Sequence, residues 1–371
     1  MSSPLRPPYR VAIIGTGAIA AAHATALTEL PDQATLVAVV DVDPSRAEQF
    51  GTQFSVPTVY TDAAEMLDAE ALDLVHICTP PQTHGPIALQ VVRSGVAALV
   101  EKPTALSLRE LDELAAAQDE HGAPVLTVFQ HRFGAAGIRL RQFAEDGRLG
   151  RPLVATCNTL WFRDDAYFDV PWRGRWNIEG GGPTMGHGIH QFDLMLSILG
   201  PWAEVSAFAA RQSRPTDTED VSIALTRFEN GALATVMNSV VSPRETSQLR
   251  FDFEHATVEV EHLYGYQDAH WTFTPALGHE HLATAWAESP SEEVSSHRMQ
   301  IAAIFDAFTN GSEPGVSLTD ARRTLEFAAA TYASAFRGET ICAGQLVGTD
   351  PFTRSMDGGM VPWKPVKNVA V

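Results

Sequence analysis

Residues 11–20 read VAIIGTGAIA, a short apolar run followed by a glycine-rich turn. The run is typical of a strand that is buried on both faces. In this G-x-G-x-x-A pattern, Gly15 permits a tight turn, Gly17 lets the backbone approach a phosphate closely, and Ala20 keeps the next helix near the strand. We therefore expect a dinucleotide to bind here, against the following residues: Gly15, Thr16, Gly17, Ala18 and Ile19.

A second buried strand, predicted over residues 35–40, ends at Asp41. This acid follows the glycine-rich turn by about 20 residues, where a carboxylate binds the ribose hydroxyls of adenosine. Because a carboxylate repels a 2′-phosphate, NAD is favoured over NADP as the cofactor. The alternative is a turn aspartate at the end of a strand, with no ligand.

Alternating strands and helices continue through the first third of the chain, over residues 72–78, 84–94 and 96–100. This alternation predicts an α/β domain with a parallel sheet and right-handed crossovers. Ligands on such sheets bind beyond the carboxyl ends of the strands. Further cofactor contacts are therefore expected at these ends, from Thr79, Pro80 and His84.

Two charged residues, Glu101 and Lys102, directly follow the strand predicted at residues 96–100, and Pro103 comes next. We expect Glu101 to contact the nicotinamide ribose and Lys102 to hold a substrate hydroxyl and assist its loss of a proton. The proline suggests a fixed peptide bond that aims the lysine. The alternative is a salt bridge at the end of the strand.

After residue 129 the pattern changes to successive strands. Glu229-Asn230-Gly231 separates two strand-like runs and predicts a hairpin. A long amphipathic helix is expected near the end of the chain. The second part is therefore predicted to be an α+β domain with a large, open, mostly antiparallel sheet, with strands over residues 153–162, 221–228, 232–241, 248–254 and 257–262 and the helix over 321–336.

An aromatic and arginine-rich segment, WFRDDAYFDVPWRGRW, occupies residues 161–176. Aromatic faces stack on the C–H faces of sugars, and arginines bind hydroxyls or anionic groups. A purely structural loop over the sheet is the alternative. The candidate substrate contacts in this segment are Trp161, Arg163, Tyr167, Trp172 and Arg173.

The next stretch, GGGPTMGHGIHQFDL at residues 180–194, places two histidines three residues apart. On a helix, His187, His190 and Asp193 share one face. Such a stripe either lines a cleft or faces solvent. A neutral histidine suits the removal of a hydroxyl proton, so His190 is the candidate base and His187 a candidate catalytic and substrate-binding residue.

Four motifs in this order, GTGAIA, ICTPPQTH, EKP and GGG…GIHQFDL, make the chain resemble the Gfo/Idh/MocA oxidoreductases over nearly its whole length. The resemblance implies a Rossmann NAD-binding domain over residues 1–129. It also implies a substrate-binding and oligomerisation domain over residues 130–371, leaving open that the C-terminal helix and tail pack back on the first domain. The protein would then be a homodimer or homotetramer that associates through the second sheet.

The resemblance also implies roles for individual residues. Lys102 would be catalytic and His190 would match the family's catalytic histidine, while Arg132 would face the substrate cleft or act at a hinge. The family often has an aspartate four residues before that histidine, where this chain has Gly186. His187 is expected to replace part of its function, and Asp193 either orients His190 or is structural.

The composition excludes several classes of partner. A formal charge of −19 disfavours nucleic acid and anionic lipid, and no apolar run is long enough to span a bilayer. Three widely spaced cysteines indicate free thiols in a reducing cytoplasm. No pattern joins the histidine pairs into a ligand set, so no metal is expected.

These observations predict an NAD-dependent dehydrogenase that transfers a hydride from a carbinol carbon of a sugar, cyclitol or sugar derivative. Two alternatives stay open. One is a redox-neutral glycoside hydrolase or lyase that oxidises its substrate transiently, and the other is a non-catalytic regulator that binds NAD.

Overall fold

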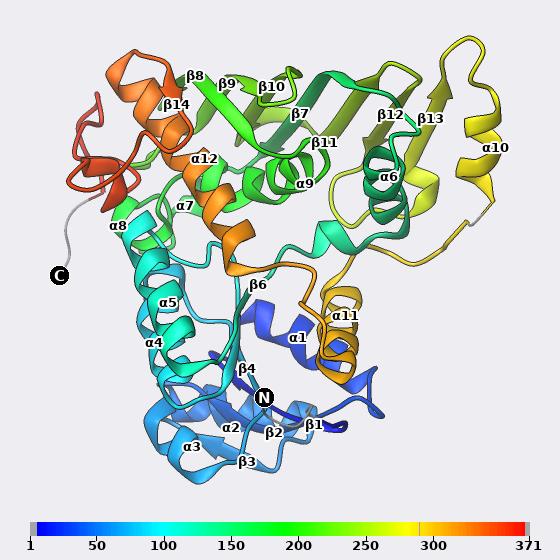
Figure 1. The fold of residues 1–371 in the computed structure, drawn as a ribbon. Coiled ribbons are helices and arrows are strands. Elements are labelled where there is room, and N and C mark those ends of the chain that lie inside the picture. Colours follow the sequence, from blue (N-terminus) through cyan, green and yellow to red (C-terminus); the bar gives the residue numbers. More distant parts are fainter. Residues whose placement is uncertain (1–5, 289, 368–371) are drawn as a thin grey trace. The chain divides into compact units, whose positions relative to one another are not determined.

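The computed structural model describes residues 6–288 and 290–367, which form two compact units (Figure 1). The first unit takes the chain up to Val128 together with His297–Arg322. The second unit takes Phe129–Ser296 and the chain from Arg323 onward. Within the described residues, no helix combines the length and the apolar character needed to cross a bilayer.

The first unit is built on a parallel sheet of six strands in the order β3-β2-β1-β4-β5-β6. This confirms the predicted α/β domain. Strands β1, β4 and β5 are apolar and almost fully buried, as expected for a sheet covered on both faces. The strands are β1 (Tyr9–Ile14), β2 (Ala34–Val40), β3 (Thr58–Tyr60), β4 (Leu74–Ile77), β5 (Ala97–Val100) and β6 (Val125–Thr127).

Helices from both ends of the chain cover this sheet. Helix α11 comes from far along the sequence, yet it packs against α1. The ring of Tyr9 stacks on that of Phe305 at a centroid distance of 5.1 Å, which ties β1 to α11. The helices of this unit are α1 (Ala18–Thr28), α2 (Pro44–Phe54), α3 (Ala63–Ala69), η1 (Pro81–Thr83), α4 (His84–Arg93), α5 (Leu108–His121) and α11 (His297–Asn310).

The second unit contains a sheet of eight strands in the order β13-β12-β11-β7-β10-β9-β8-β14. Within the described residues, β10 and β7 pair in parallel and the other neighbouring strands are antiparallel, which confirms the predicted open, mostly antiparallel sheet. The strands are β7 (Pro152–Phe162), β8 (Trp202–Ala210), β9 (Val221–Phe228), β10 (Leu233–Ser239), β11 (Val241–Phe253), β12 (Ala256–Glu261), β13 (Trp271–Pro275) and β14 (Ile341–Cys342).

Helix α9 covers one face of this sheet, where it packs against β7 and β11 (Figure 1). The predicted long C-terminal helix is α12, which crosses the boundary between the units after Arg322. The other helices are η2 (Gln130–Phe133), α6 (Ala135–Glu145), α7 (Asp165–Phe168), α8 (Trp176–Glu179), the π-helical turn η3 (Thr184–Gly188), α9 (Ile189–Leu199), η4 (Asp268–His270), α10 (His281–Ala287), α12 (Leu318–Arg337) and η5 (Pro351–Thr353).

Candidate functional site

The turn between β1 and α1 has the shape that a dinucleotide requires. Gly15 has a φ of +88°, and a Cβ placed on it would lie 2.8 Å from the Thr79 side chain. A Cβ on Gly17 would meet nothing within 4 Å. Gly17 is also the N-cap of α1, and no side chain caps this helix. The open space at an uncapped helix N-terminus suits a pyrophosphate.

Asp41 follows β2 as an ionised carboxylate beside this turn. Its Oδ2 accepts hydrogen bonds from the backbone N (2.9 Å) and the hydroxyl (2.7 Å) of Thr16. Its Oδ1 accepts from the Arg46 guanidinium at 3.0 Å and from the backbone N of Asp43 at 3.0 Å. Burial acts to raise the pKa of Asp41, but the hydrogen bonds outweigh it and the pKa lies below its usual value.

His84 contacts both the end of β4 and the segment that follows β5. Its Nδ1 lies 2.7 Å from the carbonyl oxygen of Pro103, and its Nε2 lies 2.7 Å from that of Thr79. The side chain is buried and both ring nitrogens face protein carbonyls. This geometry gives His84 a positioning role between the end of β4 and the segment after β5, with Thr79 and Pro80 at the same end of the sheet.

Glu101 and Lys102 directly follow β5, at the carboxyl end of the sheet. The Lys102–Pro103 peptide bond is cis. The Glu101 side chain points into a buried histidine cluster in the same unit, where it contacts His23 and His297. Sequence reasoning missed both histidines, because nothing in the local pattern links positions that far apart.

In the second unit, His190 is buried at the start of α9 among aromatic rings. Its ring centroid lies 5.3 Å from that of His131 and 5.7 Å from that of Tyr264. The His131 ring in turn packs against Tyr266 at 4.6 Å. Of the stripe predicted from the sequence, His190 and Asp193 are buried and His187 is half-buried. Tyr264 and Tyr266, which lie beyond β12, are further site candidates that sequence reasoning missed.

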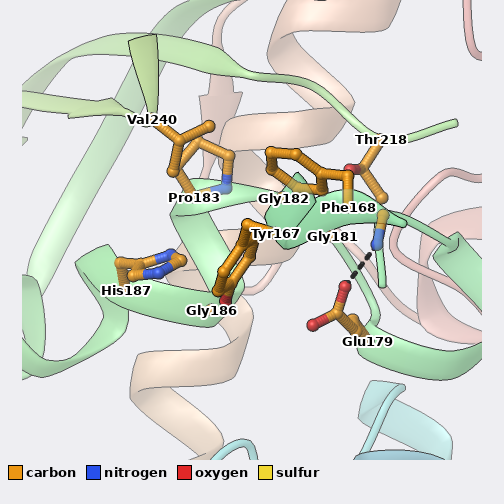
Figure 2. Close-up of a pocket in the computed structure, with 11 residues that line it drawn as sticks. Tyr167, Phe168, Glu179, Gly181, Gly182, Pro183, Gly186, His187, Thr218 and Val240 are labelled. Carbon is orange, nitrogen blue, oxygen red and sulfur yellow. Dashed lines mark hydrogen bonds between the residues drawn. The ribbon is translucent and has the colours of Figure 1, made fainter. Parts of the chain in front are cut away.

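His187 lies beside the aromatic segment, as Figure 2 shows for Tyr167. Its ring centroid is 4.8 Å from that of Trp161 and 6.3 Å from that of Tyr167. The Arg163 guanidinium lies over both aromatic rings, 4.9 Å from Trp161 and 5.4 Å from Tyr167. Its Nη1 also pairs with Glu245 Oε1 at 2.9 Å. The fold thus brings His187 together with three of the sequence candidates.

Arg173 adds a second cation to this cluster. Its guanidinium lies 3.8 Å from the ring centroid of Tyr167 and 4.3 Å from that of Trp172. Its Nη1 lies 3.8 Å from Glu179 Oε1. Both arginines of the cluster therefore face a carboxylate as well as an aromatic ring, which balances their charge.

Arg132 forms a buried ion pair. Its Nε and Nη2 each donate to an oxygen of Asp193 at 2.7 Å, and Thr324 donates to the same carboxylate at 2.8 Å. Both partners of the pair are buried. The pair makes Arg132 a counter-charge for the Asp193 carboxylate.

Glu219 anchors the glycine-rich stretch that precedes the two histidines. Its carboxylate accepts from the backbone N of Gly182 at 2.9 Å, the backbone N of Thr184 at 3.2 Å and the Tyr332 hydroxyl at 2.8 Å. Burial raises the pKa of Glu219 to about 7. Glu219 lies two residues before the start of β9, and it was not among the site residues predicted from the sequence.

A small cavity of about 20 Å³ opens next to His187 and Gly186 (Figure 2). Tyr167, Glu179 and Pro183 also line it. A Cβ added to Gly186 would meet nothing within 4 Å. The volume is that of about one water molecule, so this cavity alone accommodates a hydroxyl group and not a whole sugar ring.

Two glycines of this stretch form a matched pair for mutagenesis. A Cβ on Gly182 would lie 1.9 Å from the backbone carbonyl oxygen of Glu219, whereas one on Gly186 meets open space. We expect Gly182→Ala to lower the free energy of unfolding by about 1–3 kcal/mol or more. Gly186→Ala should unfold like the wild type. Urea unfolding checks both, and a Gly182→Ala protein of unchanged stability would contradict the close approach.

The raised pKa of Glu219 makes stability depend on pH. The Glu219 carboxyl stays protonated up to about pH 7 in the folded protein and only up to about pH 4.5 in the unfolded chain. The stabilisation that this proton gives the folded state is therefore fully present below pH 4.5 and is lost as pH rises through 7. Glu219→Gln stays neutral throughout. The free energy of unfolding of Glu219→Gln, minus that of the wild type, should therefore rise by about 3 kcal/mol between pH 4.5 and pH 8.

Urea unfolding of both proteins at a series of pH values measures this difference. The comparison uses only the change with pH, so a constant effect of the new amide cancels. The exposed Glu229, changed to Gln, is the matched control and should track the wild type. A constant gap between Glu219→Gln and the wild type would show that Glu219 titrates as an ordinary carboxylate.

Comparisons with known proteins agree with this architecture. Residues 9–129 match a family model described as "Oxidoreductase family, NAD-binding Rossmann fold". Residues 138–279 match the model of the GFO/IDH/MocA C-terminal domain. Together the two matches cover more than half of the chain.

Individual relatives extend over most of the chain. It is 29% identical to a D-apiose dehydrogenase of Paraburkholderia graminis, over 95% of this chain and 94% of that protein. It is 26% identical to a myo-inositol 2-dehydrogenase of Thermotoga maritima, over 62% of this chain and 68% of that protein.

A solved structure shares the fold. The WlbA dehydrogenase from Bordetella pertussis, crystallised with NADH and UDP-GlcNAcA, superposes with a TM-score of 0.81 at 24% identity. The match covers 90% of this chain and 98% of that one. From the two family models and the shared fold, we conclude that the chain belongs to the GFO/IDH/MocA family of oxidoreductases.

Proposed function

We propose that this protein is an NAD-dependent dehydrogenase that oxidises a CH–OH group of a sugar, cyclitol or sugar derivative. The observation that carries the proposal is the open, uncapped N-terminus of α1 at Gly17, next to the ionised Asp41. The substrate class is supported by the relatives that are named D-apiose dehydrogenase and myo-inositol 2-dehydrogenase.

The residues at the turn fit an NAD molecule. Gly15, Thr16 and Gly17 would hold its pyrophosphate, and Asp41 would bind the adenosine ribose. The Asp41 carboxylate also disfavours NADP, because it repels a 2′-phosphate. The nearby guanidinium of Arg46 already pairs with Asp41, so it does not offset this repulsion. When bound, NAD supplies the acceptor for the hydride that leaves the substrate carbon.

The protein's own residues must then remove the hydroxyl proton. Lys102 is proposed to hold the substrate hydroxyl, and His190 to accept its proton as a general base. His187, next to the small cavity, is proposed to bind a neighbouring hydroxyl. The cage of His131 and Tyr264 around His190 fixes the orientation of its ring.

The aromatic segment is proposed to recognise the body of the substrate. The faces of Trp161, Tyr167 and Trp172 suit the C–H faces of a sugar ring. Arg163 and Arg173 each face a carboxylate, so they offer N–H donors to hydroxyls with little excess positive charge. This arrangement favours a neutral polyhydroxylated substrate.

Absorbance at 340 nm tests the proposal. Purified protein is mixed with NAD or NADP and with free sugars, cyclitols and glycosides, and released aglycone is assayed in the same wells. We expect NADH to accumulate with a free sugar or cyclitol, and NADP to be used poorly. Lys102→Met should lower turnover by about 100-fold or more, as loss of an acid–base group does, while its NAD affinity stays close to that of the wild type.

Other outcomes of this assay would contradict the proposal. Released aglycone without net NADH would indicate the redox-neutral hydrolase or lyase. Cofactor binding without turnover of any compound would indicate the regulator, and full activity of Lys102→Met would remove the lysine from the mechanism.

The outer face of the second sheet is proposed to join two copies of the chain. Large apolar side chains on four strands lie open there, the most exposed being Phe208 on β8 at 82%. Phe208 lies opposite Ile223, and Leu233 lies opposite Val154, so the strand register places these residues in two cross-strand pairs. Exposed apolar patches of this kind mark interaction sites. The residues of the patch are Val154, Phe208, Ile223, Leu225 and Leu233.

A charge in the centre of this patch should prevent association. We expect the wild type to be a dimer or tetramer and Phe208→Glu to shift toward the monomer, with an unchanged circular dichroism spectrum. Sedimentation velocity measures both proteins. Val347→Glu, a change at another exposed apolar residue outside the sheet, is the control. A monomeric wild type would refute the role of this face.

A further inference from the structure

Glu101 is a buried carboxylate that three hydrogen bonds hold in one orientation. Its Oε1 lies 2.9 Å from His23 Nε2 and 3.0 Å from His297 Nε2. Its Oε2 accepts from the backbone N of Lys102 at 3.1 Å. His23 lies on α1 and His297 is the first residue of α11, so residues from three distant parts of the sequence of the first unit meet here.

The hydrogen-bond distances determine which ring nitrogens carry protons. An ionised carboxylate only accepts, so His23 Nε2 and His297 Nε2 must both donate to Glu101. Neutral His23 then has a lone pair on Nδ1, which lies 3.0 Å from His76 Nδ1. His76 donates to it and keeps a lone pair on its buried Nε2. This chain of donors needs no extra proton on His23 or His76, so these two histidines leave the negative charge of Glu101 in place.

Four titratable groups near Glu101 carry no charge near neutral pH. Burial raises the pKa of Glu101, but the hydrogen bonds from His23 and His297 outweigh it and place the pKa well below the usual range. Burial lowers the pKa values of His23, His76 and His84, and it raises that of the Cys78 thiol, so these groups are uncharged near neutral pH. Lys102 is the cation next to Glu101 in the sequence, and it serves the proposed substrate hydroxyl.

The place of Glu101 in the sheet decides which part of a dinucleotide it faces. Asp41 follows β2 and marks the adenosine half of the site, so the second nucleotide belongs on the half formed by β4, β5 and β6. Glu101 follows β5 in that half. The nicotinamide ring carries a positive charge in NAD⁺ and none in NADH, so only the oxidised form gains from a negative charge there.

We propose that Glu101 makes the cofactor site bind oxidised nicotinamide in preference to the reduced form, and that His23 and His297 are positioning residues that hold it in place. This inference rests on the proposed function. It goes beyond it by assigning which cofactor form the free enzyme holds, because a site that favours NAD⁺ is loaded with the oxidised form and releases NADH readily.

Dissociation constants of NAD⁺ and NADH, measured by isothermal titration calorimetry without substrate, test the proposal. We expect Glu101→Gln to weaken NAD⁺ binding by tenfold or more, the effect of removing one charge near another, and to leave NADH binding nearly unchanged. Glu70→Gln is the matched control, because Glu70 pairs with Arg10 near the amino end of β1, whereas Glu101 follows the carboxyl end of β5. It should bind both forms like the wild type.

Variants of His297 separate positioning from general stability. The His297 side chain is 12% exposed, so it tolerates substitution better than the fully buried His23. His297→Leu removes one donor to Glu101 and should reduce the preference for NAD⁺ in the same direction as Glu101→Gln. His297→Gln keeps an N–H donor and should restore most of it. A structural role alone would change the binding of both cofactor forms together.

Three results would overturn the inference. One is an NAD⁺ to NADH affinity ratio in Glu101→Gln that stays within twofold of the wild type. Another is a ratio in His297→Leu that matches the wild type while Glu101→Gln fails to fold. The third is a stoichiometric metal ion in the purified protein that His297→Leu removes, because Glu101 would then be a ligand with His23 and His297. A wild type that binds neither cofactor form would refute the proposed function itself.

Discussion

A buried carboxylate must receive hydrogen bonds, and this requirement organises both units of the protein. Glu101 receives them from His23 and His297, Asp193 from Arg132 and Thr324, and Glu219 from two backbone amides and a tyrosine. In each case the donors come from a segment distant in the sequence. Each carboxylate therefore fixes the position of a site segment that the local backbone alone would leave free.

The three carboxylates differ in how their charge is balanced. Asp193 pairs with the guanidinium of Arg132, which balances its charge. Glu101 accepts from two histidines and a backbone amide, and we propose that its charge acts on a bound ligand. Glu219 has a hydroxyl and backbone amides, and its pKa of about 7 shows that burial outweighs these donors. The same side-chain chemistry thus serves packing, ligand binding and pH response, according to the donors supplied.

Glycine makes this arrangement possible where the backbone must come close to another group. At Gly15, the turn is crowded against the end of β4, and at Gly182, the chain lies against the carbonyl of Glu219. Gly186 is different, because the space around it is open and forms part of the cavity beside His187. The glycine-rich stretch before α9 therefore combines one position set by close packing with one that leaves room for a ligand group.

Much of the fold could be predicted from the sequence, because its signals are local. The apolar run and glycines of residues 11–20, the buried strands with their short connections, and the Asn-Gly hairpin each depend on neighbours in the chain. They determined the parallel sheet, the open antiparallel sheet and the family. Strands β3, β8, β13 and β14 were missed, since tertiary pairing and not a turn signal defines them.

The partners of the site residues were decided only by the tertiary structure. No local sequence pattern shows that Glu101 contacts His297, 196 residues further on. No such pattern shows that the Arg132 guanidinium pairs with Asp193. Folding likewise creates the ring contact between Tyr264 and His190. It also creates the hydrogen bond from the backbone N of Gly182 to Glu219. The sequence by itself determined the fold class and a set of candidate site residues, whereas charge balance, tautomers and ring packing depend on groups that only the folded chain brings within a few ångströms.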